Sequence, residues 1–295
     1  KQEGVKTMKF DAVVGNPPYQ SMTNGGSDSG RAARQAAPIF NYFVEQAKML
    51  EPGYVSMIIP ARWYNGGIGL NAFRADMLND KHLTKLVDFA NSKDCFTTVD
   101  IGGGLCYFLW ERDHEDECLV INMNSGEQDA LRRSLNQYGN LFIRSNKAIS
   151  IIEKIRAKTD SFVDEMVSAI DTFGIPSKVR GHEEYVEGDI LLVHSDGANS
   201  SKTSYISRDV VTKNAHLIDK YKVRISILVP QNGEAGVKPE KGYRSMSTPH
   251  LVYPGQVDSF SYLNIGFFDN ENEAENFRKY MMCKLPRFMM RTTYS

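Results

Sequence analysis

Long hydrophobic runs and paired cysteines are both missing from this sequence of 295 residues. No apolar stretch approaches the length of a membrane span, and no signal peptide is visible at the N-terminus. Four cysteines are present without a C-x-x-C spacing or a neighbouring histidine pattern: Cys95, Cys106, Cys118 and Cys283. These absences argue against a zinc site or a disulfide framework and predict reduced thiols in a cytoplasmic protein without a metal ion.

An excess of positive charge is also missing, because 35 lysine and arginine residues stand against 36 aspartate and glutamate residues. This balance argues mildly against nucleic-acid binding, which needs basic residues on the contact face. One segment departs from it, with basic residues interleaved with Tyr205 and Tyr221: Lys202, Arg208, Lys213, Lys220, Lys222 and Arg224. Such a segment is typical of a nucleic-acid contact, and a solvated face explains it equally well.

The apolar run FDAVV, residues 10–14, leads into the tetrapeptide Asn-Pro-Pro-Tyr at 16–19. Prolines often end strands because they cannot donate to a ladder, but this explains only the first of them. The Asn16 side-chain oxygen and the Pro17 carbonyl can together accept both hydrogens of one amino group, and the Tyr19 ring offers a face to a planar heterocycle. The tetrapeptide predicts a site for an exocyclic amine at the C-terminal edge of a sheet, with a purely structural tyrosine as the alternative.

The NPPY segment after an apolar strand resembles the catalytic motif of amino-group methyltransferases that use S-adenosylmethionine. It is most similar to the adenine-specific (N6) DNA methyltransferases of bacterial type II restriction-modification systems, including combined restriction and modification enzymes. Two later segments look like the regions that follow in those enzymes: residues 38–78, which begin PIFNYF, and residues 94–110, DCFTTVDIGGGLCYFLW. The resemblance is good as far as residue 120 and loose beyond it.

The resemblance implies a catalytic corner made of Asn16, Pro17, Pro18 and Tyr19. The target adenine would be flipped out of double-stranded DNA, stacked on Tyr19 and held through its N6 amine by Asn16 and Pro17, for direct in-line methyl transfer. Phe96 lies where related enzymes carry an aromatic residue that contacts the flipped base. An ordinary core phenylalanine is an equal alternative at that position.

Two groups of basic residues are predicted DNA contacts. Arg31 and Arg34 follow the Gly/Ser-rich stretch 21–30, which we interpret as a loop that orders over DNA, with a simple disordered loop as the alternative. The second group lies in the basic segment and comprises Lys202, Arg208, Lys213, Lys222 and Arg224.

The implied cofactor is S-adenosylmethionine, but its binding motif is largely absent. Related enzymes place a glycine-rich turn and an acidic residue before the NPPY segment, and only fifteen residues precede Asn16. The cluster Gly102 to Gly104 follows the motif and opens a strand, so we interpret it as a turn. We therefore expect the chain to be the C-terminal part of a longer polypeptide.

The hydrophobic pattern predicts an α/β fold with a partial Rossmann-like methyltransferase sheet, antiparallel edge strands and, after it, a mixed α+β target-recognition domain. The expected strands are 10–15, 54–59 and 84–89 and a mutually paired set at 104–110 and 117–122. From residue 145, Ile149, Ile152 and Ile155 share one face of an amphipathic helix. The expected domains are 1–144, catalytic, and 145–295, target recognition.

Two other functions fit the motif. The same tetrapeptide occurs in enzymes that methylate a protein glutamine amide or a guanine amine in ribosomal RNA, although the long chain after Tyr19 favours DNA recognition. The second alternative is an inactive DNA-binding or specificity fragment, which the missing donor motif supports.

Overall fold

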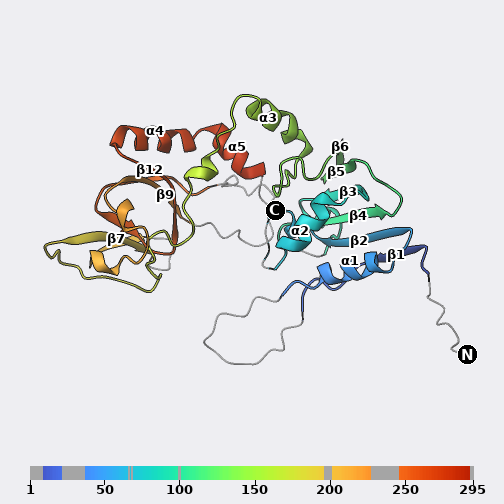
Figure 1. The fold of residues 1–295 in the computed structure, drawn as a ribbon, viewed down its shortest axis with the longest axis horizontal. Coiled ribbons are helices and arrows are strands. Elements are labelled where there is room, and N and C mark those ends of the chain that lie inside the picture. Colours follow the sequence, from blue (N-terminus) through green and yellow to red (C-terminus); the bar gives the residue numbers. More distant parts are fainter. Residues whose placement is uncertain are drawn as a thin grey trace, which may run out of the picture. The chain divides into compact units, whose positions relative to one another are not determined.

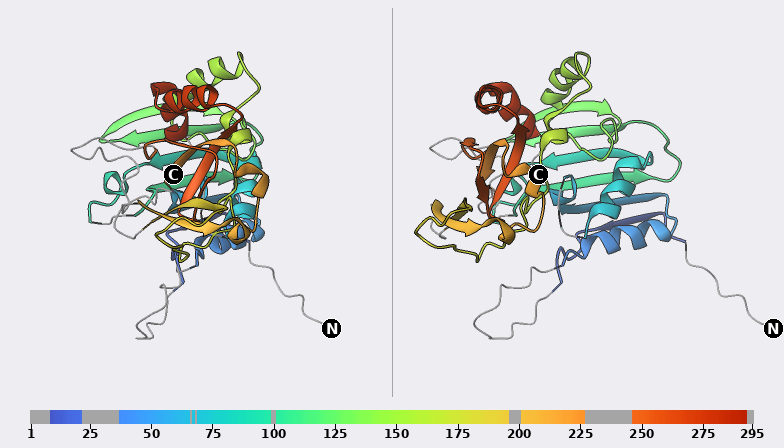
Figure 2. Two further views of the ribbon diagram at one scale, coloured as in Figure 1. Left: turned by 90° about the vertical axis from the view of Figure 1, so that its left-hand side faces the viewer. Right: turned by 60° about the vertical axis from the view of Figure 1, so that its left-hand side comes forward.

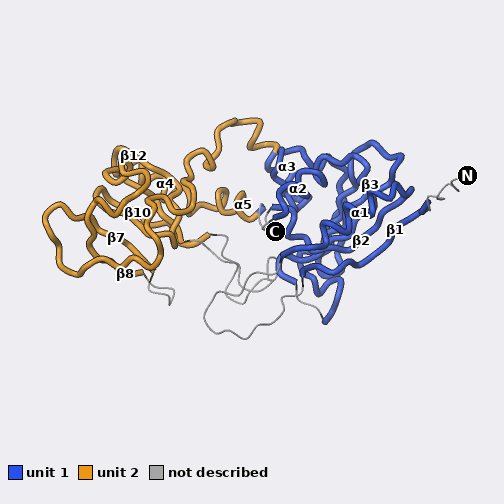
Figure 3. Tube along the Cα trace, turned by 60° about the horizontal axis from the view of Figure 1, so that its bottom comes forward, with its two compact units in different colours: residues 1–152, 230–242, 292–295 blue, residues 153–229, 243–291 orange. Residues whose placement is uncertain are grey.

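The computed structural model describes residues 9–21, 37–65, 67, 69–98, 101–195, 201–226 and 246–292. The chain divides into two compact units, drawn in blue and orange in Figure 3. The first unit consists mainly of residues 1–152, and the second of residues 153–229 and 243–291. The division falls inside helix α3 (Asn146–Arg156), whereas the sequence suggested a boundary before this helix, between residues 144 and 145.

A six-stranded mixed sheet forms the centre of the first unit (Figure 1). Its strands lie in the order β1 (Ala12–Gly15), β2 (Tyr54–Pro60), β4 (Leu105–Glu111), β3 (Leu83–Phe89), β5 (Cys118–Asn124) and β6 (Glu127–Arg133). Strands β1, β2, β3 and β5 run in one direction, and β4 and β6 run in the other. Figure 2 shows this sheet (blue to green) from two further directions. The predicted mixed α/β character is confirmed, but the antiparallel strand at the edge is β6, which was not among the predicted strands.

The predicted pairing of the strands near 104–110 and 117–122 is wrong. Strand β3 lies between β4 and β5 and pairs with both, antiparallel with β4 and parallel with β5. Four consecutive residues at the end of β3 are buried, as expected for a strand covered on both faces. The link from β4 to β5 begins beside the start of β3, where the Glu111 N–H donates to the His82 carbonyl at 2.9 Å. The short link from β4 to β5 therefore connects two strands that are not neighbours in the sheet.

Two helices of the first unit, α1 (Phe40–Met49) and α2 (Asn71–Asn79), contribute to one apolar core. Helix α1 buries Phe40, Val44 and Ala47, which recur at the spacing of one helical face. Strand β2 alternates buried and less buried residues, so its apolar side chains meet this face. Helix α3 buries Ile149 and Ile152, as its pattern predicted.

The second unit holds two three-stranded sheets, each with its own apolar cluster. One sheet has the order β10 (His250–Val252), β9 (Tyr221–Ser226), β12 (Tyr262–Phe268), and the other the order β11 (Gln256–Asp258), β7 (Asp189–Ser195), β8 (Ser201–Ser207). Its helices are α4 (Glu271–Met281) and α5 (Lys284–Thr292). Short 3-10 turns in the two units are η1 (Ala61–Trp63), η2 (Ser92–Asp94), η3 (Val163–Met166), η4 (Arg208–Val210) and η5 (Ala215–Leu217). None of the helices described is long and apolar enough to cross a membrane.

Candidate active site

The tetrapeptide begins directly after β1, at the edge where the parallel strands end. Gly15, the last residue of β1, is paired with Met57 of the parallel strand β2. Asn16 is exposed and Pro17 is buried, so the chain is anchored at the first proline while the amide before it stays accessible. This is the position at which open α/β sheets bind ligands, and an accessible amide oxygen there can accept from an amine.

Tyr19 packs against the apolar core of the first unit. Its ring is half-buried against the apolar cluster, and its buried hydroxyl has no hydrogen-bond partner among the described residues. Burial raises the pKa of Tyr19 to about 12, and the nearby thiols of Cys95 and Cys106 add to the rise. The phenol is therefore neutral at any physiological pH and is suited to packing more than to proton transfer.

The backbone around Tyr19 is tied to the start of α1. The Ile39 N–H donates to the Tyr19 carbonyl at 3.3 Å, and the Ser21 N–H donates to the Ala37 carbonyl at 3.0 Å. These bonds fix the two ends of the chain segment between the corner and the helix. Arg31 and Arg34, both predicted DNA contacts, belong to that segment and lie outside the described residues.

Phe96 follows the short turn η2, which comes shortly after strand β3. Its N–H donates to the Ser92 carbonyl at 2.8 Å, and its side chain is half-buried and not part of the buried core. Cys95, the preceding residue, is close enough to Tyr19 to influence its pKa. The structure thus brings the Phe96 loop beside the tetrapeptide, although the two are far apart in the sequence.

A buried ion pair supports this loop. The Arg144 guanidinium donates to Asp88 at 2.8 Å, to the Gly103 carbonyl at 2.7 Å and to the Phe89 carbonyl at 3.2 Å. Phe89 ends β3 and Gly103 precedes β4, so one side chain holds both ends of the loop that carries Phe96. A buried guanidinium needs such acceptors because an unpaired buried charge is very costly.

The described residues do not fit S-adenosylmethionine at either glycine-rich turn. A Cβ atom added to Gly104, whose φ is +80°, would lie 2.1 Å from the Phe89 carbonyl oxygen, so protein backbone fills the space of a ligand. The other glycine-rich stretch, residues 65–70, precedes α2 and was not identified from the sequence. The strand after α2 is β3, and Asp88 near its end is the carboxylate that could bind a ribose. Asp88 is buried and paired with Arg144, so it is unavailable.

Three of the predicted DNA contacts in the basic segment are exposed, and two are not. Lys202 is exposed, Arg208 donates to Asp219 at 2.6 and 3.0 Å, and Lys213 is paired with Asp171 at 2.9 Å. Exposed pairs of this kind contribute little stability and can exchange their partner for a phosphate.

Lys222 and Arg224 are poor candidates for DNA contacts because β9 carries both into the interior. Lys222 is fully buried, and its Nζ donates to the carbonyls of Ile218 and Lys220 at 2.8 Å each. Arg224 is 9% exposed, and its guanidinium lies 4.6 Å from the centre of the Tyr262 ring. Residues 222–225 of β9 are all buried, so this strand is covered on both faces, and the count of basic residues carries no information about that.

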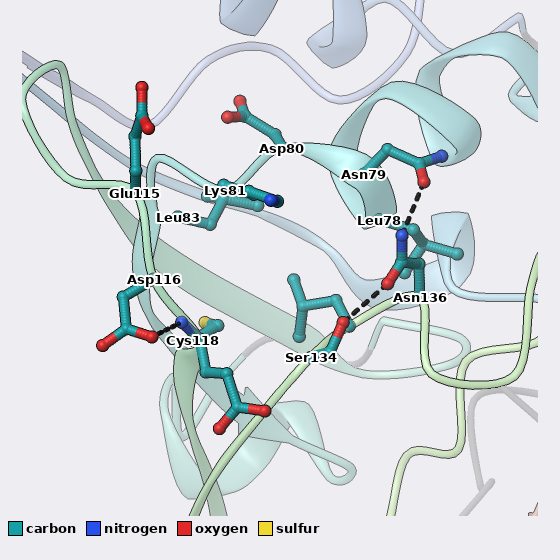
Figure 4. A pocket seen from close by; sticks show the side chains of 12 residues that line it. Leu78, Asn79, Asp80, Lys81, Leu83, Glu115, Asp116, Cys118, Ser134 and Asn136 are labelled. Carbon is teal, nitrogen blue, oxygen red and sulfur yellow. Dashed lines mark hydrogen bonds between the residues drawn. The ribbon is translucent and has the colours of Figure 1, made fainter.

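A pocket of about 190 Å³ lies where strands β3 and β5 of the first unit begin (Figure 4). It is lined by residues at the start of β3 and β5, including Leu83, Cys118 and the carboxylates of Glu115 and Asp116. Because the tetrapeptide follows the end of a strand parallel to β3 and β5, this pocket is separate from the corner. Among the described residues no group of three or more His, Cys, Asp or Glu side chains is arranged to hold a metal ion.

Comparison with known proteins shows what the N-terminal region is similar to. Residues 1–96, which include both the tetrapeptide and Phe96, match the Eco57I restriction-modification methylase family. An uncharacterized adenine-specific methylase of Mycoplasma pneumoniae is 39% identical over 135 residues, which make up 43% of this chain and 31% of that protein. The chain thus spans about a third of the length of this relative. The predicted resemblance to adenine-specific restriction-modification methylases is confirmed.

Solved structures of restriction-modification proteins show a weaker likeness. The methyltransferase subunit of a type I system from Streptococcus thermophilus is 15% identical, with a TM-score of 0.29 over 54% of this chain and 34% of its own. The type IIG restriction endonuclease BpuSI is 14% identical, with a TM-score of 0.33 over 64% of this chain and 25% of its own. Scores of this size do not establish a shared overall fold.

Proposed function

We propose that the first unit forms the target-base side of a DNA adenine-N6 methyltransferase of a restriction-modification system. The observation that carries the proposal is the placement of the tetrapeptide: an exposed Asn16 directly after a parallel strand, anchored by a buried Pro17. The match of residues 1–96 to a methylase family supports the same chemistry.

The chemistry of this corner concerns the amine that is methylated. The Asn16 side-chain oxygen and the Pro17 carbonyl accept the two N6 hydrogens of a flipped adenine, and the half-buried Tyr19 ring supports the base. Two acceptors on the hydrogens leave the nitrogen lone pair free to attack a methyl group, so no base with a shifted pKa is needed before the transfer. S-adenosylmethionine is the proposed methyl source; it would leave as the thioether, and the methylated nitrogen would then release one proton to solvent.

The second unit is proposed to contact double-stranded DNA. Lys202, Arg208 and Lys213 are exposed and would contact phosphates, whereas the buried Lys222 and Arg224 support the sheet that carries them. Contacts of this kind position a protein on the duplex without reading its sequence.

Methyl transfer to long DNA of mixed sequence tests the proposal, because it requires no knowledge of the recognition site. The protein is incubated with tritiated S-adenosylmethionine, and the DNA is then digested to nucleosides. Label in N6-methyladenine with the wild type and none with Asn16→Ala would support the proposal. The matched control is Gln128→Ala, which removes an exposed amide from the antiparallel edge strand β6.

A second candidate function is DNA binding without methyl transfer. It is favoured by the closed turn at Gly104 and the buried Asp88, which leave no fit for the donor among the described residues. DNA that is bound but unlabelled would support this second function and overturn the first. Label in protein or RNA, with none in DNA, would indicate an amide or RNA methyltransferase instead.

A further inference from the structure

The positive charge of Arg62 lies near the corner, and no carboxylate among the described residues is paired with it. It lies in η1, just after β2 ends at the same sheet edge as β1. Its Nε and Nη2 atoms are buried and have no hydrogen-bond partner in the described parts of the chain. Burial also lowers the pKa of Arg62. Buried donors without acceptors cost free energy and call for an explanation.

The guanidinium of Arg62 also lies near the first residue of a helix. Its carbon is 5.8 Å from the centre of the ring of Phe40, the first residue of α1. Helix α1 has no side-chain N-cap and no acidic residue in its first turn. The aligned peptide dipoles leave partial positive charge at such an end, so Arg62 adds like charge to it.

The first turn of a second helix packs against Phe40. Phe73, in the first turn of α2, packs edge-on against Phe40 with ring centres 5.8 Å apart. Helix α2 likewise has neither a side-chain N-cap nor an acidic first turn. The backbone at Gly69, just before α2, has a φ of +81°, and an added Cβ there would meet no atom within 4 Å. Open space therefore adjoins the start of this helix.

The converging groups adjoin the catalytic corner. Ile39, the residue before α1, donates its N–H to the Tyr19 carbonyl at 3.3 Å. Trp63, the residue after Arg62, donates to the Cys106 thiol at 3.4 Å, and Cys106 in turn influences the pKa of Tyr19. The two observations place Arg62 and Tyr19 in the same region of the first unit.

We infer that Arg62 and the N-terminal ends of α1 and α2 bind a phosphate group of the DNA backbone next to the target nucleotide. An anion there accepts from the unpaired guanidinium and offsets the positive ends of both helices. The inference rests on the proposed function, because a base held at Tyr19 brings its own backbone to this rim. The contact positions the target strand and reads no sequence.

The salt dependence of DNA binding tests this inference. Each phosphate contact contributes about −0.9 to the slope of log K against log salt, so Arg62→Gln should reduce the magnitude of this slope by about 1 and weaken binding. Arg62→Lys retains the slope with lower affinity because it keeps the charge but loses the fork of donors. The matched control is Arg112→Gln, which removes an exposed arginine just after β4, at the other edge of the sheet, and leaves the slope unchanged.

Asn71→Asp separates phosphate binding from folding. Asn71 is exposed and is the first residue of α2, so a carboxylate there favours the helix dipole and keeps or raises the free energy of unfolding. The same carboxylate repels a bound phosphate and weakens DNA binding. A wild-type slope in Arg62→Gln, or wild-type affinity in Asn71→Asp, would overturn the inference. If the wild type did not bind DNA at all, the proposed function would fail together with it.

Discussion

Arg144 and Asp88 form a buried bidentate pair, with Nε of the arginine 2.9 Å from Oδ2 and Nη2 2.8 Å from Oδ1 of the aspartate. The two residues are contributed by different parts of the first unit, Asp88 by β3 and Arg144 by the chain after β6. Through the Gly103 carbonyl the same guanidinium holds the start of β4. The pair thus connects the sheet to the loop that lies beside Tyr19.

Breaking this pair should destabilise the first unit strongly. Asp88→Ala leaves a buried guanidinium without its counter-charge, and we expect the free energy of unfolding to fall by about 3–5 kcal/mol. Urea unfolding followed by tryptophan fluorescence measures the effect, because both tryptophans, Trp63 and Trp110, lie in the first unit. Adding Arg144→Met should restore part of the loss. A loss below about 1 kcal/mol, typical of exposed pairs, would contradict the assignment.

Tyr19 should tolerate the loss of its hydroxyl but not of its ring. The hydroxyl is buried without a partner, so Tyr19→Phe removes an unsatisfied polar group and leaves stability unchanged or slightly higher. Tyr19→Ala removes the ring and should abolish methyl transfer. The methylation assay and urea unfolding of both variants provide the test. Loss of activity in Tyr19→Phe would show that the hydroxyl has a role that the structure does not indicate.

Asp258 should make the second unit less stable as the pH rises. Burial raises its pKa to about 6, while Arg224, Asn264 and Lys222 act in the opposite direction. Between pH about 4 and about 6 the folded state holds a proton that the unfolded state has lost, so the free energy of unfolding falls by up to about 3 kcal/mol across this window.

The variant Asp258→Asn isolates that contribution, because an amide does not titrate. Urea unfolding at pH 4 and pH 7, followed by circular dichroism, should show a smaller decrease in stability for the variant than for the wild type. An equal decrease in both proteins would show that the Asp258 carboxyl does not titrate in this range.

The outer edge of β1 should promote self-association. No described strand pairs with that edge, and Val14 on it is 78% exposed. Unpaired edges with apolar side chains bind other strands, and a charged residue prevents this. We expect Val14→Lys to reduce association measured by light scattering. Met49→Lys is the control, because it removes an exposed apolar side chain from helix α1 and no strand edge. Equal effects of both changes would point to general hydrophobicity as the cause.

Local features of this protein were predictable from its sequence. The apolar run before Asn16 predicted β1, and the isoleucine spacing predicted the buried face of α3, because both depend on neighbouring residues along the chain. The methylase resemblance also came from a contiguous segment and is confirmed by the match of residues 1–96.

The tertiary structure alone decided which residues meet and which side chains are buried. Strand β3 inserts between β4 and β5, and β9 buries Lys222 within a basic segment that resembles a surface. The meeting of Arg62 with the starts of α1 and α2 likewise depends on contacts between separate elements. Residue type and spacing describe one element at a time, whereas pairing, burial and converging charge arise only when elements pack together.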